Sequence, residues 1–514
     1  MFTGLLTAAV LLPIVAAVLI LLFGRDARTV RIFAVAVSVV EFLLTLFVFL
    51  NYDTSEGADQ FQMVDRVVDW IPIESFEVQY YLAVDGLSAP LVMLTGLLGM
   101  VAIFASWTIG QQRREQGEEP REREYFMWLL ALQGAVVGVF TSLDFLLFFV
   151  FWELELIPMF FLISVWGSGR REYSAMKFLI FTILGSAFML VGILVLYFST
   201  GSFDMTELPA LVRQAGTGLP ALAVFLLLFV AFAVKLPVWP LHTWLPDAHT
   251  DAPTAASVML AGVLLKMGAY GMFRLGAILP DVLRDVSWAL AALGVINILY
   301  GASVVLRQTD MKRLIAFSSI SHMGFILLGL ASAVGVAGSV SPIGLTGASL
   351  QMFTHGVITG MLFLLVGYVY ERAHTRHIPD LGGLVGRMPV LGAALLVAGL
   401  ASLGLPSTAG FVSEIHVFLG TFPVWSWMTA LGAFGVVLTA GYILWMIQRV
   451  MLGPLNPRFA DLKDATPLEL VPIAALIIAI MVVGIFPSTL TDVFSTGITP
   501  IVESLQMDLT LSRN

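Results

Sequence analysis

Apolar residues in this chain gather in long runs that are separated by short polar stretches. About 20 apolar residues in a helix cross the ~30 Å hydrocarbon core of a membrane, so each run is a candidate membrane-spanning helix. We find fourteen runs, near 3–23, 32–50, 86–107, 125–141, 144–166, 174–199, 219–240, 254–278, 286–306, 314–336, 342–370, 388–420, 424–448 and 469–488. The pattern predicts an all-α polytopic membrane protein with about 14 transmembrane helices.

Composition supports this prediction, and it argues against a soluble protein, cysteine-based sites and nucleic-acid binding. Charged residues make up 12% of the chain, against roughly 25% in soluble domains, and the mean hydropathy is +0.94. The chain has no cysteine, so it cannot supply disulfides or cysteine ligands for iron–sulfur or zinc sites. The net charge of −9 includes no basic run that would indicate nucleic-acid binding.

The loops between the runs differ in charge according to their side. Of the 26 lysines and arginines, 19 fall in or beside the odd-numbered loops and only five on the opposite side. Cytoplasmic loops are rich in Lys and Arg, so the odd-numbered loops face inward and both termini are predicted to face outward. The acidic loop Asn51–Tyr81 then lies outside, as a small hairpin or a surface helix.

Two of the predicted spans contain a proline beside polar residues in mid-run. Pro237 follows Lys235 by two positions, and Pro406 begins a stretch of small residues before Glu414. Proline interrupts a helix, so the spans 219–240 and 388–420 are predicted to be broken helices. They are five spans apart, which indicates two five-helix units in inverted orientation, a recurring plan in transporters.

Ionisable residues occur inside the apolar runs, where each charge costs free energy unless it has a role or a partner. Lys235 and Lys266 lie within spans, and Glu153 lies near the middle of another. Glu153 is the expected partner of Lys235, either as a static ion pair or as a switchable one. Glu155 is two positions on, on another helix face, and is expected to meet a neighbouring helix or headgroups. Lys266 lies at mid-depth, where an amine can gain and lose a proton.

Three further titratable groups follow in chain order. His322 and His355 lie in the spans 314–336 and 342–370, and Glu414 follows the second helix break. Histidine exchanges protons near neutral pH, so the row can pass protons, although a lone buried histidine is often only hydrogen-bonded. Neither histidine has a second ligand three or four positions away, so no metal site is predicted.

The link between the two lysines is polar and carries His242, Asp247 and His249. It is either the mouth of an access path from the inner side or an ordered loop with helix caps. No Walker A, dinucleotide-binding or G-x-S-x-G motif is present, so nucleotide binding and hydrolysis have no support. A row of proton-exchanging groups has no energy source of its own, so a partner or a counter-ion gradient must drive it.

Several stretches resemble one family. The run KLPVWPLHTWLPDAHTDAPTAASVMLAGVLLKMGAYG from Lys235, WELELIP around Glu153, SSISHMGF around His322 and LQMFTHG around His355 resemble the antiporter-like subunits of respiratory complex I. The similarity covers most of the chain. A glutamate at Glu414 resembles the subunit M (chain 4) branch of proton-translocating NADH-quinone oxidoreductase. Subunits L and N and the Mrp-type antiporters generally have lysine there.

The resemblance implies a domain plan and a set of roles. Helices 1–3 with the outer loop would occupy residues 1–124, the inverted repeats (helices 4–8 and 9–13) residues 125–278 and 279–452, and the last helix and tail residues 453–514. Glu153 would tune Lys235, Lys266 would be the central proton carrier, His322 and His355 would extend the path, and Glu414 would release protons outside.

The resemblance also implies partners. The chain would translocate protons beside other antiporter-like subunits, driven by quinone reduction in a peripheral redox arm that holds flavin, iron–sulfur clusters and quinone, with no cofactor in this chain. The electron donor would be NAD(P)H or ferredoxin. The membrane would be a bacterial plasma membrane or a thylakoid-type membrane. Alternatives are a subunit of a Mrp-type cation/proton antiporter, a subunit of a membrane-bound hydrogenase, and a purely structural scaffold.

Overall fold

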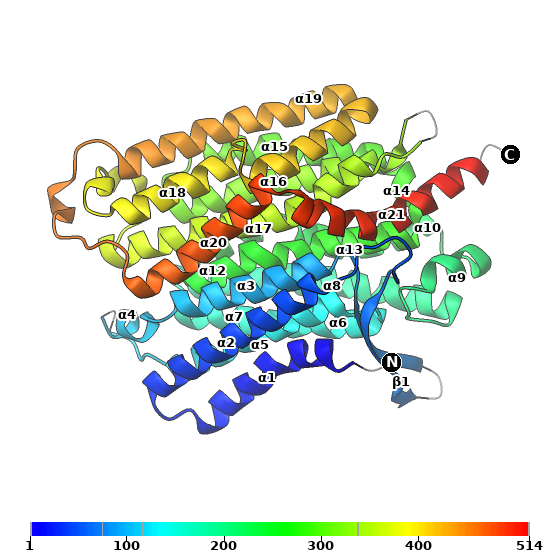
Figure 1. The fold of residues 1–514 in the computed structure, drawn as a ribbon, viewed down its shortest axis with the longest axis horizontal. Helices are drawn as coiled ribbons and strands as arrows, with labels where there is room; N and C mark the ends of the chain where they lie inside the picture. The colour runs from blue at the N-terminus through cyan, green and yellow to red at the C-terminus, as the bar shows by residue number, and fades with distance from the viewer. Residues whose placement is uncertain (1–2, 74–75, 116, 337–338, 512–514) are drawn as a thin grey trace.

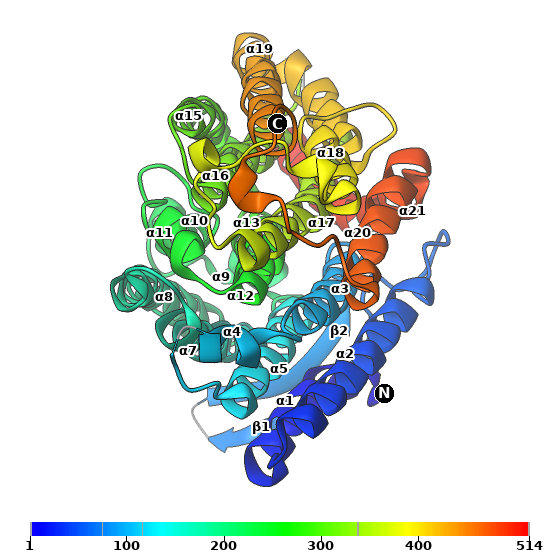
Figure 2. The same ribbon diagram turned by 90° about the vertical axis from the view of Figure 1, so that its left-hand side faces the viewer.

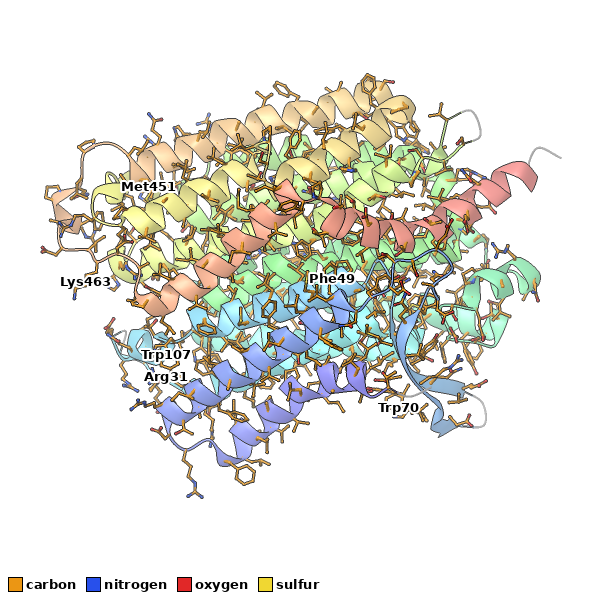
Figure 3. All side chains as sticks on the ribbon, in the orientation of Figure 1. Arg31, Phe49, Trp70, Trp107, Met451 and Lys463 are labelled. Atoms are coloured by element: carbon orange, nitrogen blue, oxygen red, sulfur yellow. The ribbon has the colours of Figure 1, made fainter. Side chains whose placement is uncertain are left out.

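The structure of the protein is a computed structural model that describes residues 3–73, 76–115, 117–336 and 339–511. Most helices lie side by side along the long axis of the molecule (Figure 1). The strands β1 (Gln62–Ile73) and β2 (Phe76–Val84) lie at one end, which we call the hairpin end. Arg31 and Lys463 lie at the opposite end (Figure 3), which we call the basic end. The start of α1 and the end of α21 lie toward the hairpin end (Figure 1).

The first part of the chain forms helices on either side of the hairpin: α1 (Leu5–Phe23), α2 (Ala27–Leu50), α3 (Ala89–Ala105) and α4 (Ile109–Glu115). The next part runs through α5 (Glu122–Thr141), α6 (Phe145–Leu154), α7 (Leu156–Trp166), α8 (Arg171–Thr200), α9 (Leu208–Ala215), α10 (Ala221–Lys235), α11 (Trp244–Asp251), α12 (Thr254–Met259), the π-helix η1 (Leu260–Leu264) and α13 (Leu265–Ile278).

The third part comprises α14 (Pro280–Asp285), α15 (Ser287–Val305), α16 (Met311–Leu330), the 3₁₀ turn η2 (Ala331–Val334), α17 (Pro342–Ala373), the 3₁₀ turns η3 (Ile378–Asp380) and η4 (Leu384–Gly386), α18 (Pro389–Ser402) and α19 (Ala409–Met451). A 3₁₀ turn η5 (Pro457–Phe459) and the helices α20 (Pro467–Ile485) and α21 (Ser488–Leu511) complete it.

Three apolar segments form the centre of the bundle. Thr254–Ile278, Met311–Val334 and Pro342–Ala373 each contain an 18-residue apolar stretch that is buried throughout, whereas only 28% of such a stretch is buried in α2. Viewed along the bundle, α13 and α17 lie toward the middle, and α1, α15 and α19 lie at the rim (Figure 2). A helix that is apolar on all sides and still buried must pack against other helices. Lys266, His322 and His355 lie on these three segments.

The predicted number of spans stays a prediction. Within the described residues, eleven helices are long and apolar enough to cross a membrane, or twelve with the bent pair α3–α4. Two further apolar helices, α10 and α18, are shorter. The helix α19 joins two helices across a kink at Trp425, where Pro423 removes a backbone donor.

The acidic loop forms a hairpin rather than a surface helix. β1 and β2 pair antiparallel, with Gln62 opposite Val84 and Arg66 opposite Tyr81. Asp65 in β1 joins the hairpin to the start of α1, because its carboxylate accepts hydrogen bonds from the backbone N–H groups of Gly4 and Thr7 and from two threonine hydroxyls.

Both predicted helix interruptions fall at the expected prolines. The helix α10 ends at Lys235, and Pro237 lies in the non-helical segment before α11. Helix α18 ends at Ser402 and α19 begins at Ala409, with Pro406 between them. The predicted span 144–166 is confirmed as one candidate membrane span, Phe145–Trp166, in which Glu155 separates the helices α6 and α7.

Candidate functional site

The first buried charge pair joins Lys235 to Glu155. The amine of Lys235 donates to a carboxylate oxygen of Glu155, and the two side chains are 1% and 0% exposed. The aromatic rings of Trp152 and Phe178 flank the amine at 5.3 and 5.6 Å, where their π-faces stabilise a cation. Two charges removed from water are tolerated only as such a pair.

This pairing corrects the sequence prediction that Glu153 would be the partner of Lys235. Glu153 is only partly buried, and Glu155 is the residue that faces Lys235. Residues two positions apart lie on different faces of a helix, and only Glu155 is in direct contact with Lys235, although the lysine charge also acts on Glu153. Glu155 lies between α6 and α7 and is completely buried.

The second contact joins Lys266 to His355. The amine of Lys266 lies 2.7 Å from Nδ1 of His355 and also donates to the carbonyl of Ala261. Ala261 belongs to the π-helix η1, in which backbone bonds run i to i+5 and local geometry changes, a frequent feature of functional sites. The lysine side chain is completely buried.

Glycines allow this contact between helices. A Cβ on Gly356 would lie 2.7 Å from the carbonyl oxygen of Gly262, closer than real Cβ contacts. Two backbones without side chains can therefore touch where η1 crosses α17. A Cβ on Gly268 would likewise lie 3.1 Å from Cβ of Lys235, so α13 packs directly on the end of α10. The two lysines consequently belong to adjoining helices.

The third contact brings His322 toward Glu414. Nδ1 of His322 lies 3.7 Å from Oε1 of Glu414 and 3.5 Å from the Gln351 side chain. A cavity of about 10 Å³ adjoins both histidines and Glu414, close to the volume that one water molecule needs. The rings of His322 and His355 are 5.6 Å apart between centroids. Glu414 is 5% exposed and therefore does not lie in open water.

The second helix break shapes the place of Glu414. Gly404 has a φ of +76°, and a Cβ there would lie 2.4 Å from Oε2 of Glu414. Both the left-handed backbone and the missing side chain favour glycine. Ser413 donates to Gln351 at 2.6 Å and bonds Thr354 at 2.8 Å, which fixes α19 against α17. Sequence reasoning did not select Gln351 or Ser413, although Gln351 begins the quoted LQMFTHG stretch.

The polar residues of the link between Lys235 and Lys266 contact different neighbours. Asp247 lies between Lys177 at 2.7 Å and Arg313 at 3.5 Å, so it joins three segments near the basic end. His242 places Nε2 3.3 Å from the Tyr300 hydroxyl. Burial lowers the pKa of His242, and Lys177 lowers it further.

His249 lies deeper than His242. Its ring is completely buried and stacks on Phe363 at 4.4 Å, and neither ring nitrogen has a hydrogen-bond partner among the described residues. Burial lowers the pKa of His249 well below its ordinary value of 6.5, and Lys312 and Lys266 lower it further. A neutral imidazole at this point has one nitrogen free to accept a proton.

A polar cavity near the basic end adjoins the start of α12. It measures about 60 Å³, and its lining includes Ser106, Gln112, Tyr125, Lys312, Glu371 and Ala252. The amine of Lys312 donates to the carbonyl of Ala252 at 2.6 Å, directly after the helix that carries His249. Sequence reasoning missed Lys312 and Glu371 because they lie at span ends, where charged residues are ordinary.

No metal site is formed within the ranges 3–73, 76–115, 117–336 and 339–511, where no group of three or more His, Asp or Glu side chains could hold an ion. The buried contacts instead form three pairs: Glu155 with Lys235, Lys266 with His355, and His322 with Glu414. Chemically, each member can hold a proton in one state and release it in another.

Comparison with known proteins gives consistent matches. Residues 142–439 match the family described as NADH:quinone oxidoreductase/Mrp antiporter, transmembrane. The chain is 43% identical over 98% of its length, and 92% of the relative, to an NAD(P)H-quinone oxidoreductase chain 4 of Synechococcus elongatus. It is 38% identical, over 98% of each chain, to NADH-quinone oxidoreductase subunit M of Rhodobacter capsulatus.

A solved structure agrees with these matches. A chain in respiratory complex I from Thermus thermophilus with bound NADH superposes with a TM-score of 0.84 and 29% identity, covering 98% of this chain and 99% of that one.

Proposed function

This chain belongs to the NADH:quinone oxidoreductase/Mrp antiporter family of membrane proteins, and on that premise we propose that it carries protons across the membrane as a subunit of a complex I-type quinone oxidoreductase. One observation carries the proposal: six ionisable side chains, almost all inaccessible to water, meet in three successive pairs across the centre of the bundle. Buried ionisable residues cost too much to be retained without a purpose.

The path begins at the basic end. Water in the polar cavity beside Lys312 and Glu371 delivers a proton toward the neutral ring of His249, which passes it to Lys266. His249 is suited to this step because it is buried and has unpartnered ring nitrogens. This gives the link with His242 and Asp247 a positioning role, since their partners hold the segment in place.

The next steps follow from the atoms in contact. The Lys266 ammonium gives a proton to Nδ1 of His355, 2.7 Å away, and the imidazolium releases its other proton from Nε2, which has no partner. His322 accepts that proton and hands one on toward Glu414 across the 3.7 Å gap. A water in the adjoining cavity would bridge the gap, as contacts beyond about 3.5 Å often require.

The Glu155–Lys235 pair would set the timing. When the pair opens, a positive charge at the end of α10 acts on Lys266 through low-dielectric surroundings, where charges interact strongly. Moving one proton against 100 mV costs about 2.3 kcal/mol, which a change at one buried charge can supply. The driving event would lie in partner subunits that hold the flavin, iron–sulfur clusters and quinone.

The remaining assignments belong to the same proposal. The electron donor is NAD(P)H or ferredoxin, and this chain is a non-redox subunit of the enzyme. The basic end is the inner side, because the arginine-rich loops lie there. Both termini lie toward the opposite, hairpin end and therefore face the outer, positive side. The inverted repeats occupy residues 125–278 and 279–452, supported by the break at Pro237 in one and at Pro406 in the other.

The experiment is Lys266→Ala in the native complex, purified and reconstituted into vesicles. We expect quinone reduction to continue while proton uptake per electron falls, because the central carrier is gone. Lys463→Ala, which removes an exposed lysine at the basic end, is the matched control and should pump normally. Full pumping by Lys266→Ala would refute the path, and sodium-dependent proton exchange without redox partners would favour an antiporter instead.

A further inference from the structure

A second column of polar groups leads from Lys266 toward the hairpin end. Tyr270 and Arg274 follow Lys266 at intervals of four residues on α13, so the three side chains share one helix face, with about 6 Å of rise between them. Asp85, which directly follows β2, meets Arg274. The column therefore points away from the path through His355 and Glu414.

The Arg274, Tyr270 and Asp85 side chains are hydrogen-bonded to one another and to the backbone, and only Nε of Arg274 has no partner among the described residues. Arg274 donates to Oδ2 of Asp85 at 2.6 Å and to the Tyr270 hydroxyl at 2.8 Å. The Tyr270 hydroxyl in turn donates to the carbonyl of Phe140 at 3.3 Å. The other oxygen of Asp85 accepts from the backbone N–H of Ser88 at 2.9 Å. Asp85 and Tyr270 are completely buried.

Beyond this cluster lies open space. A cavity of about 180 Å³ adjoins Arg274 at the hairpin end, and its lining includes the polar side chains Gln60, Thr206, Arg213 and Ser504. It is large enough for several water molecules. Along α13, Tyr270 and Arg274, with Asp85, thus stand between Lys266 and a cavity large enough for water at the hairpin end.

We propose that Arg274, held by Asp85 and Tyr270, is an electrostatic barrier that prevents protons from passing directly between Lys266 and the cavity at the hairpin end. The inference rests on the proposed function, since a barrier matters only if Lys266 carries protons. With this direct route closed by Arg274, protons on Lys266 can leave only through His355 and Glu414.

The chemistry of each group suits a barrier. A guanidinium stays protonated in proteins and has no acceptor, so it cannot relay a proton. Its fixed charge repels an approaching hydronium ion, as arginines do in pores that exclude protons. The single O–H of Tyr270 already donates to the carbonyl of Phe140, so Tyr270 must break that hydrogen bond before it can donate toward Lys266. Asp85 cancels the cost of burying the charge, and both its oxygens are occupied.

The test is Arg274→Gln in the complete complex, reconstituted into vesicles with a pH-sensitive dye inside. Glutamine keeps hydrogen-bonding capacity toward Asp85 and Tyr270 but removes the charge. Passive proton conductance, measured without electron donor after a pH jump, should rise about tenfold, because the lost charge lies in weakly screened surroundings. Quinone reduction should be unchanged. Arg274→Lys keeps a positive charge beside Asp85 and should leak less than Arg274→Gln.

Two further variants make the result decisive. The double variant Arg274→Gln with Lys266→Ala should lose the extra conductance, because Lys266 is the inner end of the leak; a leak that persists would show a packing defect and overturn the proposal. If Arg274→Gln does not assemble, Arg274→Gln with Asp85→Asn removes both buried charges together and is measured in its place. If neither Arg274→Gln nor its combination with Asp85→Asn raises the proton conductance, the proposal is overturned as well. The proposed function is tested separately, because full pumping by the single variant Lys266→Ala would refute it without any measurement on Arg274.

Discussion

The partner of Lys235 gives the sharpest comparison that the structure offers. Glu155→Gln and Glu153→Gln remove the same charge from positions two residues apart, without changing the size of the side chain. Glu155 contacts Lys235 and is completely buried, whereas Glu153 is partly exposed. We therefore expect only Glu155→Gln to leave the Lys235 amine without its counter-charge.

The stability cost of Glu155→Gln follows from the burial of Lys235. Removing one member of a buried ion pair costs about 3–5 kcal/mol, because the other charge remains out of water without compensation. Lys235 is 1% exposed, so solvent cannot relieve this cost. Glu153 is partly exposed, but one of its carboxylate oxygens is buried, so Glu153→Gln is expected to cost about 1 kcal/mol. The two variants should therefore differ by about 2–4 kcal/mol, which corresponds to a roughly 30- to 900-fold change in an equilibrium constant.

Three measurements on the purified complex separate the variants. The amount of intact complex and its thermal inactivation rate report the stability cost, and proton uptake per quinone reduced reports coupling. We expect Glu155→Gln to reduce the amount of intact complex, to speed its thermal inactivation and to lower proton uptake per quinone reduced, and Glu153→Gln to stay close to the unaltered complex. Normal pumping in Glu155→Gln together with loss in Glu153→Gln would refute the assignment and restore the pairing predicted from the sequence.

Three further predictions follow. His355→Gln should preserve assembly, since glutamine can still bond Lys266, but should lower proton uptake per electron about tenfold or more, because the proposed path needs the imidazole ring to receive the proton; vesicle pumping assays check this. Gly404→Ala should cost about 1–3 kcal/mol, because φ is +76° and the new Cβ would lie 2.4 Å from Glu414; thermal inactivation and pumping should both suffer, and an unchanged variant would contradict the geometry. Burial acts to raise the pKa of Asp65, but its hydrogen bonds lower it below the ordinary 3.8, so the stability that it gives the hairpin is present at neutral pH and is lost as the pH falls through that lowered pKa. Asp65→Asn should therefore speed proteolysis of the hairpin at pH 7, and equal cleavage rates in both proteins would argue against this anchor.

The sequence alone determined much of the architecture, because the membrane makes the requirement local. A span needs about 20 apolar residues wherever it occurs, so the runs could be found without knowing their neighbours. Proline breaks a helix through its own ring, and the interruptions at Pro237 and Pro406 lie where the sequence placed them. Charged residues inside apolar runs likewise marked Lys266 and Glu414 before any contact was known.

Only the tertiary structure decided which of these groups meet. One residue along a helix turns a side chain by 100°, so the choice between Glu153 and Glu155 depends on the rotation of α6 and α7 against α10. The π-helical segment that turns the Ala261 carbonyl toward Lys266 leaves no mark in the apolar pattern. Arg274 read as an ordinary loop cation until its contact with Asp85, 189 positions earlier, was seen. The apolar pattern shows which face each helix must bury, and only the packing of the helices determines which neighbour covers that face.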